Sequence, residues 1–228
     1  MFKKQLAEFV GTFALTFVGG GAIIVTSGQE LIAISLAHGL ILAVMVASMM
    51  HISGAQFNPA VSVALASRGK QSWGDAFSLS VFQLLGGIAA AFLLKATMVP
   101  AFEFANEHIG ETLGKYSNAS TPDMVSAWRV LLLEGLATFF LMWVIMGVAV
   151  DGKNAKHSGI AALAIGGVVA ADIYCFGPLT GASMNPARSF GPALVVSDWT
   201  LHWCYWVGPI VGAGIAALVY DTVMGTED

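Results

Sequence analysis

The sequence predicts an all-α membrane protein with six transmembrane helices and two half-membrane re-entrant helices in an inverted repeat. The first observation is composition: of 228 residues, 57% are hydrophobic and only 11% are charged, whereas a soluble domain carries about 25% charged residues. The second is a series of apolar stretches that each hold the ~20 residues needed to cross a bilayer. The third is a tripeptide, Asn-Pro-Ala, that occurs twice. We therefore expect a multi-pass protein of the lipid bilayer, with no nucleic-acid partner.

Six stretches are long and apolar enough to form spanning helices. They lie near residues 5–26, 31–51, 76–98, 127–150, 159–177 and 202–222. The first follows two lysines, as the apolar part of a signal peptide does. It continues for about 20 residues without a clear small-residue cleavage site, so we interpret it as a retained span.

The two tripeptides mark the starts of two short helices. Asn58-Pro59-Ala60 follows the second span and Asn185-Pro186-Ala187 follows the fifth. Asn is a good N-cap, and Pro fits the first helical turn because it has no N–H to leave unpaired. The apolar segments 58–67 and 185–197 hold only ~10–12 residues, about half the thickness of a bilayer core.

The order span, span, half-helix, span occurs twice. Glu8 precedes Asn58 by 50 positions and Glu134 precedes Asn185 by 51. The separation between the Glu and the Asn is thus nearly the same in both halves, which indicates an internal repeat. Each copy has an odd number of full spans, so the second inserts upside down relative to the first. The N-termini of the two half-helices should then meet near the midplane.

We expect one domain over residues 1–228. It comprises a first repeat at 1–100, a second at 126–228, and an extracellular loop at 101–125 that links them. Lys and Arg in short loops orient the chain because they favour the cytoplasmic side. One side collects Lys3, Lys4, Arg68, Lys70, Lys153 and Lys156, and the other collects Lys95, Lys115 and Arg129. Both termini should therefore be cytoplasmic.

Two acids, Glu8 and Glu134, lie inside predicted spans, where an ionisable group has a functional or structural role. One hypothesis is proton or ion coupling. The other, which we favour because each repeat has one such Glu, is that the carboxylate accepts hydrogen bonds from backbone N–H groups of the nearby loop. His51 either has a similar role or lines a pore. For Asp172 we prefer a structural role.

The loops before the two Asn residues are Gly54-Ala55-Gln56-Phe57 and Gly181-Ala182-Ser183-Met184. Non-helical backbone at membrane depth is tolerated only where it lines a cavity or is buried in protein. Lining a pore, these loops would supply a ladder of carbonyl acceptors. The side-chain oxygens of Asn58 and Asn185 can cap their helices while the amide NH₂ groups face the lumen.

This arrangement suits a small, neutral, hydrogen-bonding solute. Each half-helix N-terminus presents about +0.5 charge at the midplane, which repels cations, including hydronium. Arg188 directly follows the second tripeptide, whereas Val61 follows the first. We interpret Arg188 as the cationic part of a constriction; the alternative is a structural salt bridge.

At these residues the chain resembles the aquaporin, or major intrinsic protein, family. The resemblance covers essentially the whole chain, from LAEFVGTF through HISGAQFNPAVS and MNPARSFGPA to HWCYWVGPIVG. It implies a homotetramer, with one pore per subunit, that conducts water passively and is not an enzyme. It also implies a selectivity filter of His38, Ile173, Ala182 and Arg188, called the filter residues below.

The filter residues resemble those of plant tonoplast intrinsic proteins more than those of strict water channels. Small Ala182 and aliphatic Ile173 imply a wider filter that also passes ammonia or other small neutral solutes, such as hydrogen peroxide or urea, while protons and ions are excluded. A glycerol or urea facilitator is the alternative, although Ser189 and Ala193 depart from the acid and base of glycerol facilitators. A secondary transporter would need a coupling site, for which the midplane offers two neutral Asn.

The sequence predicts no cofactor, no metal site and no catalytic residue, because it lacks metal-ligand spacing and hydrolase motifs. Cys175 and Cys204 could form one disulfide, but we favour buried free thiols. The short N-terminus and the lack of tails favour a prokaryotic inner membrane. The sequon at Asn118 is then incidental.

Overall fold

The computed structural model describes residues 2–99, 101–106, 108–110, 126–152 and 159–224. Within these ranges, six helical segments are long and apolar enough to cross a membrane. The long helices are α1 (Phe2–Val25), α2 (Leu31–Ser53), α4 (Trp73–Met98), α5 (Ala127–Ile145), α7 (Ala161–Thr180) and α9 (Cys204–Val219). The short elements are α3 (Pro59–Ser67), α8 (Pro186–Val196), the 3₁₀ turn η1 (Glu103–Asn106), and the π-helical turns η3 (Met146–Val150) and η4 (Tyr220–Met224) that extend α5 and α9.

The predicted fold class is confirmed: every predicted span is a helix, and both tripeptides open a short one. With η3 and η4 counted as parts of the fourth and sixth spans, the ends differ from the prediction by at most three residues. The largest differences are at the start of α1 and α4 and at the end of α7. Helix α7 continues past its Pro178 to Thr180, because a proline in the last turn of a helix removes only one helical hydrogen bond.

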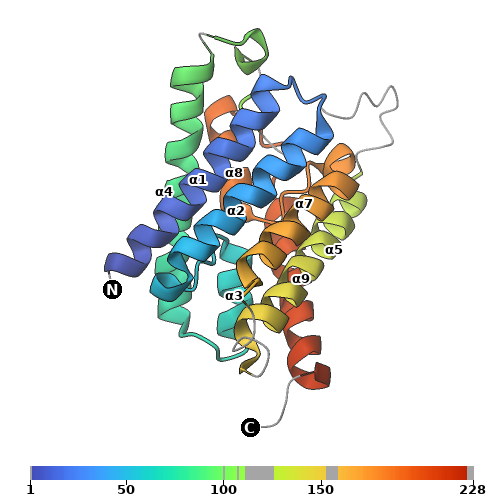
Figure 1. Cartoon of the computed structure of the whole chain (residues 1–228). Coiled ribbons are helices and arrows are strands. Elements are labelled where there is room, and N and C mark those ends of the chain that lie inside the picture. The colour runs from blue at the N-terminus through green and yellow to red at the C-terminus, as the bar shows by residue number, and fades with distance from the viewer. Residues whose placement is uncertain (1, 100, 107, 111–125, 153–158, 225–228) are drawn as a thin grey trace.

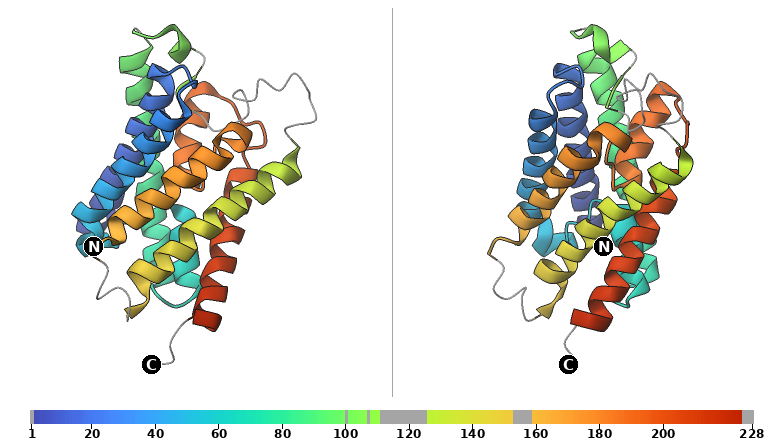
Figure 2. Two further views of the ribbon diagram at one scale, coloured as in Figure 1. Left: turned by 45° about the vertical axis from the view of Figure 1, so that its right-hand side comes forward. Right: turned by 90° about the vertical axis from the view of Figure 1, so that its right-hand side faces the viewer.

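The long helices form two groups that meet along α2 and α7. Helix α1 packs against α2 and α4, α5 packs against α7 and α9, and α2 packs against α7. The half-helices lie between the groups, α3 toward the lower end and α8 toward the upper end of the views in Figures 1 and 2. Helix α8 packs on α4, and α3 packs on both α4 and α9. Each half-helix therefore contacts the other repeat, so the two halves interlock.

Two glycines allow α2 and α7 to touch along their backbones. A methyl group added to Gly39 would overlap the carbonyl oxygen of Gly166, and one added to Gly166 would overlap the carbonyl oxygen of Gly39. The contact is reciprocal, as expected where equivalent helices of two inverted repeats cross. Small residues at such crossings let membrane helices approach closely.

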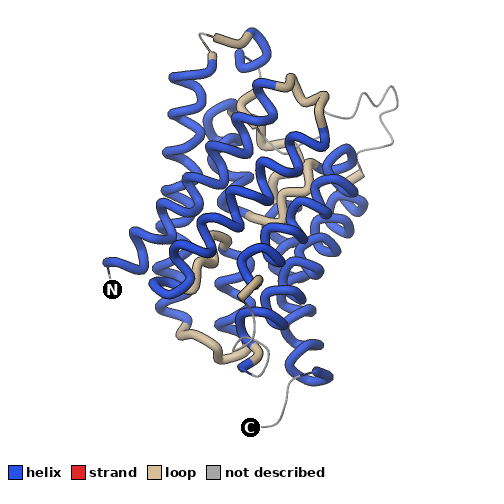
Figure 3. Tube along the Cα trace, in the orientation of Figure 1, coloured by secondary structure: helices blue, strands red, loops and turns tan. Residues whose placement is uncertain are grey.

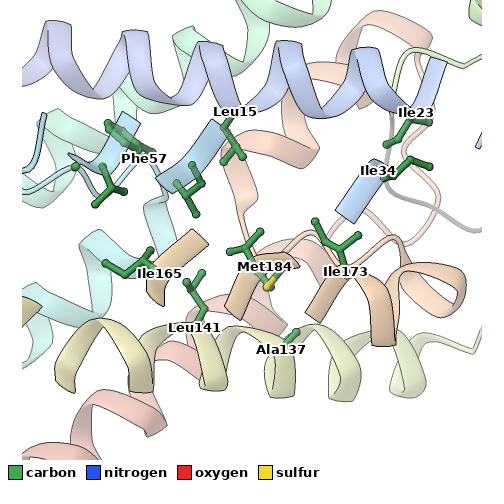
Figure 4. Close-up of a cluster of buried hydrophobic side chains, with 14 residues drawn as sticks. Leu15, Ile23, Ile34, Phe57, Ala137, Leu141, Ile165, Ile173 and Met184 are labelled. Carbon is green, nitrogen blue, oxygen red and sulfur yellow. The ribbon is translucent and has the colours of Figure 1, made fainter. Parts of the chain in front are cut away.

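The largest apolar cluster lies between the two groups of helices, where several of its side chains also line a cavity. It joins Leu15 of α1 and Ile34 of α2 to Leu141 of α5 and Ile165 of α7, with Met184 from the loop before α8 (Figure 4). Burial of large apolar side chains in this region holds the groups together by close packing.

Both cysteines are free thiols, as favoured from the sequence. Cys204 is fully buried at the start of α9, but the prediction that Cys175 is buried is wrong, since it is exposed. Cys175 lies on the outer face of α7, two positions after the buried Ile173, and residues two apart on a helix do not share a face. Asn118, Lys115, Lys153 and Lys156 lie outside the described residues.

Substitution of Gly166 tests the helix crossing. Gly166→Ala should lower the free energy of unfolding by about 1–3 kcal/mol, because the added methyl overpacks the contact with Gly39. Gly167→Ala is the matched control, since no described atom outside its own helix lies within 4 Å of a methyl there; it should leave the stability unchanged or raise it by up to about 1 kcal/mol. The measurement is thermal unfolding in detergent. Equal effects of the two substitutions would contradict this packing.

Candidate functional site

The two Asn side chains cap the half-helices in the same way. Asn58 Oδ1 accepts from the N–H of Ala60 at 2.9 Å, and Asn185 Oδ1 accepts from the N–H groups of Ala187 at 3.0 Å and Arg188 at 3.2 Å. Both Asn residues are extended, with φ of −155° and −148°. The positive ends of both helix dipoles are thus directed at the centre of the molecule.

The loops that lead into the half-helices run through the interior of the molecule (Figure 3) and share an unusual backbone conformation. In the first loop φ is +89° at Gly54, +49° at Ala55 and +49° at Phe57. The second loop repeats the pattern, with φ of +84°, +43° and +56° at Gly181, Ala182 and Met184. A non-glycine residue in this region costs roughly 1–2 kcal/mol, so contacts from elsewhere must hold the two loops in place.

A buried carboxylate holds the first loop. Glu8 Oε2 accepts from the N–H of Phe57 at 2.6 Å and from Gln83 Nε2 at 2.7 Å. Its Oε1 accepts from the N–H of Gln56 at 3.0 Å and from Ser53 Oγ at 2.6 Å, and Ser53 in turn accepts from the N–H of Ala55. Four donors converge on a carboxylate that is 0% exposed, which is the pattern an acceptor-only group requires.

Glu134 holds the second loop with equivalent bonds. Its Oε2 accepts from the N–H of Met184 at 2.8 Å, and its Oε1 accepts from the N–H of Ser183 at 3.0 Å and from Thr180 Oγ1 at 2.7 Å. Thr180 accepts from the N–H of Ala182, as Ser53 accepts in the first repeat. Both acids therefore make the hydrogen bonds that the structural hypothesis describes. Among the described residues, neither is part of the cavity walls described below.

The two loops are also bonded to each other across the centre. Asn58 Nδ2 donates to the carbonyl of Met184 at 2.8 Å, and Asn185 Nδ2 donates to the carbonyl of Phe57 at 2.7 Å. Each Asn thus caps its own helix with its oxygen and binds the opposite loop with one of its two amide hydrogens. These bonds fix the distance between the half-helices.

Two cavities follow one another through the molecule. The larger, of about 520 Å³, extends from Lys4 and Lys70 near the start of α1 past both Asn residues. The smaller, of about 190 Å³, extends from Gln29 and Pro178 at the other end. His38, Ile173 and Arg188 line both cavities, so they stand where the two meet. Ala182 lines the larger one beside them.

The four filter residues are therefore brought together, although they lie on α2, α7, the second loop and α8. His38 Nδ1 lies 2.8 Å from the carbonyl oxygen of Ile34, and His38 Nε2 lies 3.2 Å from Arg188 Nη2. A guanidinium only donates and a carbonyl only accepts. The imidazole must then carry its proton on Nδ1 and accept with Nε2, so both ring nitrogens are occupied.

Most residues predicted for the carbonyl ladder lie on a cavity wall. Gly54, Ala55, Gln56, Ser183 and Met184 line the larger cavity, and Gly181 lines only the smaller one. Phe57 departs from the prediction: among the described residues it is absent from both walls. Its carbonyl accepts from Asn185 instead, and its ring lies against Gly11 of α1.

The Pro and Ala residues of the two tripeptides, all within the described part of the chain, do not contact the cavities but support the Asn side chains. Pro59, Ala60, Pro186 and Ala187 are buried behind the Asn side chains, where they form the first turns of α3 and α8.

His51 is exposed and, of the described residues, is not one that lines either cavity. Asp172 is buried on α7, and its Oδ2 atom accepts from no donor within the described part of the chain; nothing in the structure explains it.

Several supporting residues were not predicted from the sequence. Ser53 and Thr180 directly precede the two loops, and an alignment of TGA with SGA would have revealed the shared hydroxyl. Gln83 gave no signal because its bond to Glu8 spans 75 positions. At the end of the larger cavity near Lys70, Gln71 donates to the carbonyl of Ser62 at 2.7 Å and accepts from Gln56 at 2.8 Å.

Comparisons with known proteins agree with this geometry. The family description Major intrinsic protein matches residues 1–220. Aquaporin TIP4-4 of Zea mays is 38% identical over 228 residues, covering 96% of this chain and 85% of the relative. Aquaporin TIP1-2 of Zea mays is 41% identical over 230 residues, covering 97% and 85%. An aquaglyceroporin from Plasmodium falciparum, solved by X-ray, superposes with a TM-score of 0.80 at 25% identity and covers 98% of this chain and 96% of its own.

Replacing a buried acid should loosen its loop. Glu8→Gln presents an NH₂ group where N–H groups of the loop need an acceptor, and an unpaired buried donor costs about 1–3 kcal/mol. We expect thermal unfolding in detergent to show a loss of this size. Glu30→Gln is the matched control, because Glu30 is exposed and its side chain makes no capping bond. Unchanged stability of Glu8→Gln would contradict the supporting role.

The two cavities together form a passage through the molecule, and a cysteine at position 182 should make this passage sensitive to mercury. In a Cys175→Ser/Cys204→Ala background, Ala182→Cys places a thiol on the wall of the larger cavity, so Hg²⁺ should block osmotic swelling of proteoliposomes. The background protein should resist Hg²⁺, because no thiol then remains. If Hg²⁺ blocks both proteins equally, position 182 does not control the passage.

Proposed function

The chain belongs to the major intrinsic protein family, and we propose that it conducts water, together with ammonia and other small neutral solutes, while excluding protons and ions. As a member of this family of channels it is an integral multi-pass membrane protein and not an enzyme. The observation that carries the proposal is the pair of cavities that meet at His38, Ile173 and Arg188, beyond the two Asn amides.

The centre of the passage supports exclusion of cations. Two helix N-termini contribute about +0.5 charge each, and the acidic residue on the described wall of the larger cavity, Asp75, is in the first turn of α4 rather than beside the Asn residues. Each Asn has one amide hydrogen beyond the one that crosses to the other loop. A water molecule between the Asn residues would accept from both, so it could not pass a proton along the file.

The filter residues support selection by size and hydrogen bonding. Arg188 is 4% exposed and contributes a full positive charge. Ile173 and Ala182 contribute apolar surface, which favours small solutes that shed water at low cost, as ammonia does more readily than an ion. The TIP names of the plant relatives agree with the filter resemblance.

A facilitator for glycerol or urea is the second candidate, because the superposed solved structure is an aquaglyceroporin. A secondary transporter is less well supported. Glu8 and Glu134 are saturated by loop donors and lie outside the cavity wall, so they offer no site for a coupled ion.

We also propose an assembly and an orientation in the membrane. The family resemblance favours a homotetramer with one pore per subunit, and a single domain of two repeats, 1–100 and 126–228. The start of α1 and the end of η4 lie toward the same end of the molecule (Figure 1). Lys4, Arg68 and Lys70 are also at this end, which favours cytoplasmic termini.

Stopped-flow swelling of proteoliposomes tests the proposal. Water and ammonia should cross faster than in empty liposomes, and glycerol should not. Glycerol conduction equal to that of water would favour the facilitator, and water permeability no higher than in empty liposomes would refute a water channel.

In the same assay, Arg188→Val should raise the permeability to cations and larger solutes by about tenfold, which corresponds to a ~1.4 kcal/mol lower barrier. Unchanged selectivity would exclude Arg188 from the constriction.

A further inference from the structure

The imidazole of His38 is enclosed on the side that faces away from the passage. Its Nδ1 is bonded to Ile34 within α2, and its Nε2 accepts from Arg188 of α8. The same Nε2 edge lies directly over Gly19 of α1, so closely that a methyl group built on Gly19 would overlap Nε2, Cδ2 and Cε1 of the ring. Helix α1 therefore forms the back wall of the His38 side chain.

From this contact we propose that Gly19 is a positioning residue for the filter: its missing side chain lets the His38 ring sit back against α1 and reach Arg188. The inference rests on the proposed channel function. Gly19 would thereby set the width of the passage without lining it.

The direction of the effect follows from the cavity walls. His38 lines both cavities, whereas Gly19, a described residue, lines neither. The ring thus stands between Gly19 and the passage. Any side chain at position 19 must push the ring toward the passage, since the ring cannot move into α1. Glycine is also costly in a helix interior, by about 1 kcal/mol relative to alanine, so its presence here is consistent with a need for space.

The displaced ring would also lose its bond to Arg188. The overlap falls on the Nε2 edge of the ring, the edge that accepts the guanidinium N–H. A shift of about 1 Å away from Arg188 would lengthen this 3.2 Å pair beyond hydrogen-bonding distance. Arg188 would then be free to change its orientation, and the filter would change in both shape and polarity.

The experiment compares Gly19→Ala with Gly21→Ala, a buried position on the same helix where a methyl meets only Leu94 and Met98 side chains, both at 3.7 Å. In swelling assays, Gly19→Ala should reduce the urea-to-water permeability ratio by about tenfold, equal to ~1.4 kcal/mol of barrier. Gly21→Ala should leave this ratio unchanged. An unchanged ratio in a folded Gly19→Ala protein would overturn the proposal.

A double variant distinguishes positioning from a general packing role. In a His38→Ala background there is no ring to displace, so adding Gly19→Ala should not alter the ratio. If Gly19→Ala alone fails to fold and the double variant folds, the overlap with His38 is the cause and the proposal stands. If both fail to fold, or if Gly19→Ala changes the ratio equally in both backgrounds, Gly19 acts on something other than His38.

A spectroscopic readout is independent of transport. The ¹⁵N NMR signals of His38 in the wild-type protein should show a neutral ring protonated on Nδ1, and Gly19→Ala should shift the Nε2 signal while Gly21→Ala does not. This result would support the positioning role even if the wild-type protein proved not to conduct water, whereas an unshifted Nε2 signal would refute it. Failure of the channel proposal and failure of this inference can therefore be told apart.

Discussion

The structure depends on the satisfaction of backbone N–H groups at membrane depth. Two non-helical loops reach the centre of the protein, where water is scarce and an unpaired N–H is costly. Glu8 and Glu134 each accept from two consecutive N–H groups of a loop. A side-chain amide could not replace them fully, because it has only one acceptor oxygen. The strained φ angles of the loops persist because these carboxylates fix the backbone on either side.

Once the loops are fixed, the two repeats bind each other. Asn58 and Asn185 each donate to the loop of the opposite repeat, and each half-helix packs on long helices from the other half. Neither half could keep this centre alone, because the bonds of Asn58 and Asn185 across it each have one partner in each repeat. The reciprocal contact of Gly39 and Gly166 joins the two repeats in the same way through their long helices α2 and α7. A rigid centre follows from this interlocking.

The proposed selectivity arises where the repeat symmetry ends. The two Asn residues, their loops and their supporting acids come in matched pairs, so the central barrier is nearly symmetric. Arg188 has only Val61 at the equivalent position of the first repeat, and the bond between Arg188 and His38 has no counterpart among the described residues. The polar constriction therefore lies to one side of the two Asn residues, where the two cavities meet. Its shape depends on α1, α2, α7 and α8 together, and for this reason a residue such as Gly19 can influence it from outside the wall.

The sequence by itself determined the spans, the half-helices and the equivalence of Glu8 and Glu134 in the two repeats. Hydropathy, N-caps and a repeated spacing can all be read along the chain. It also predicted residues for the passage, of which the structure places His38, Ile173, Ala182 and Arg188 on a cavity wall. Only the tertiary structure decided which atoms face it: the carbonyl of Phe57 was predicted to line the passage but binds Asn185. The role of Gly19 could likewise not be predicted from the sequence. It depends on the absence of a side chain, which leaves room for the His38 ring from α2. Such assignments depend on how helices approach one another, which spacing along the chain does not encode.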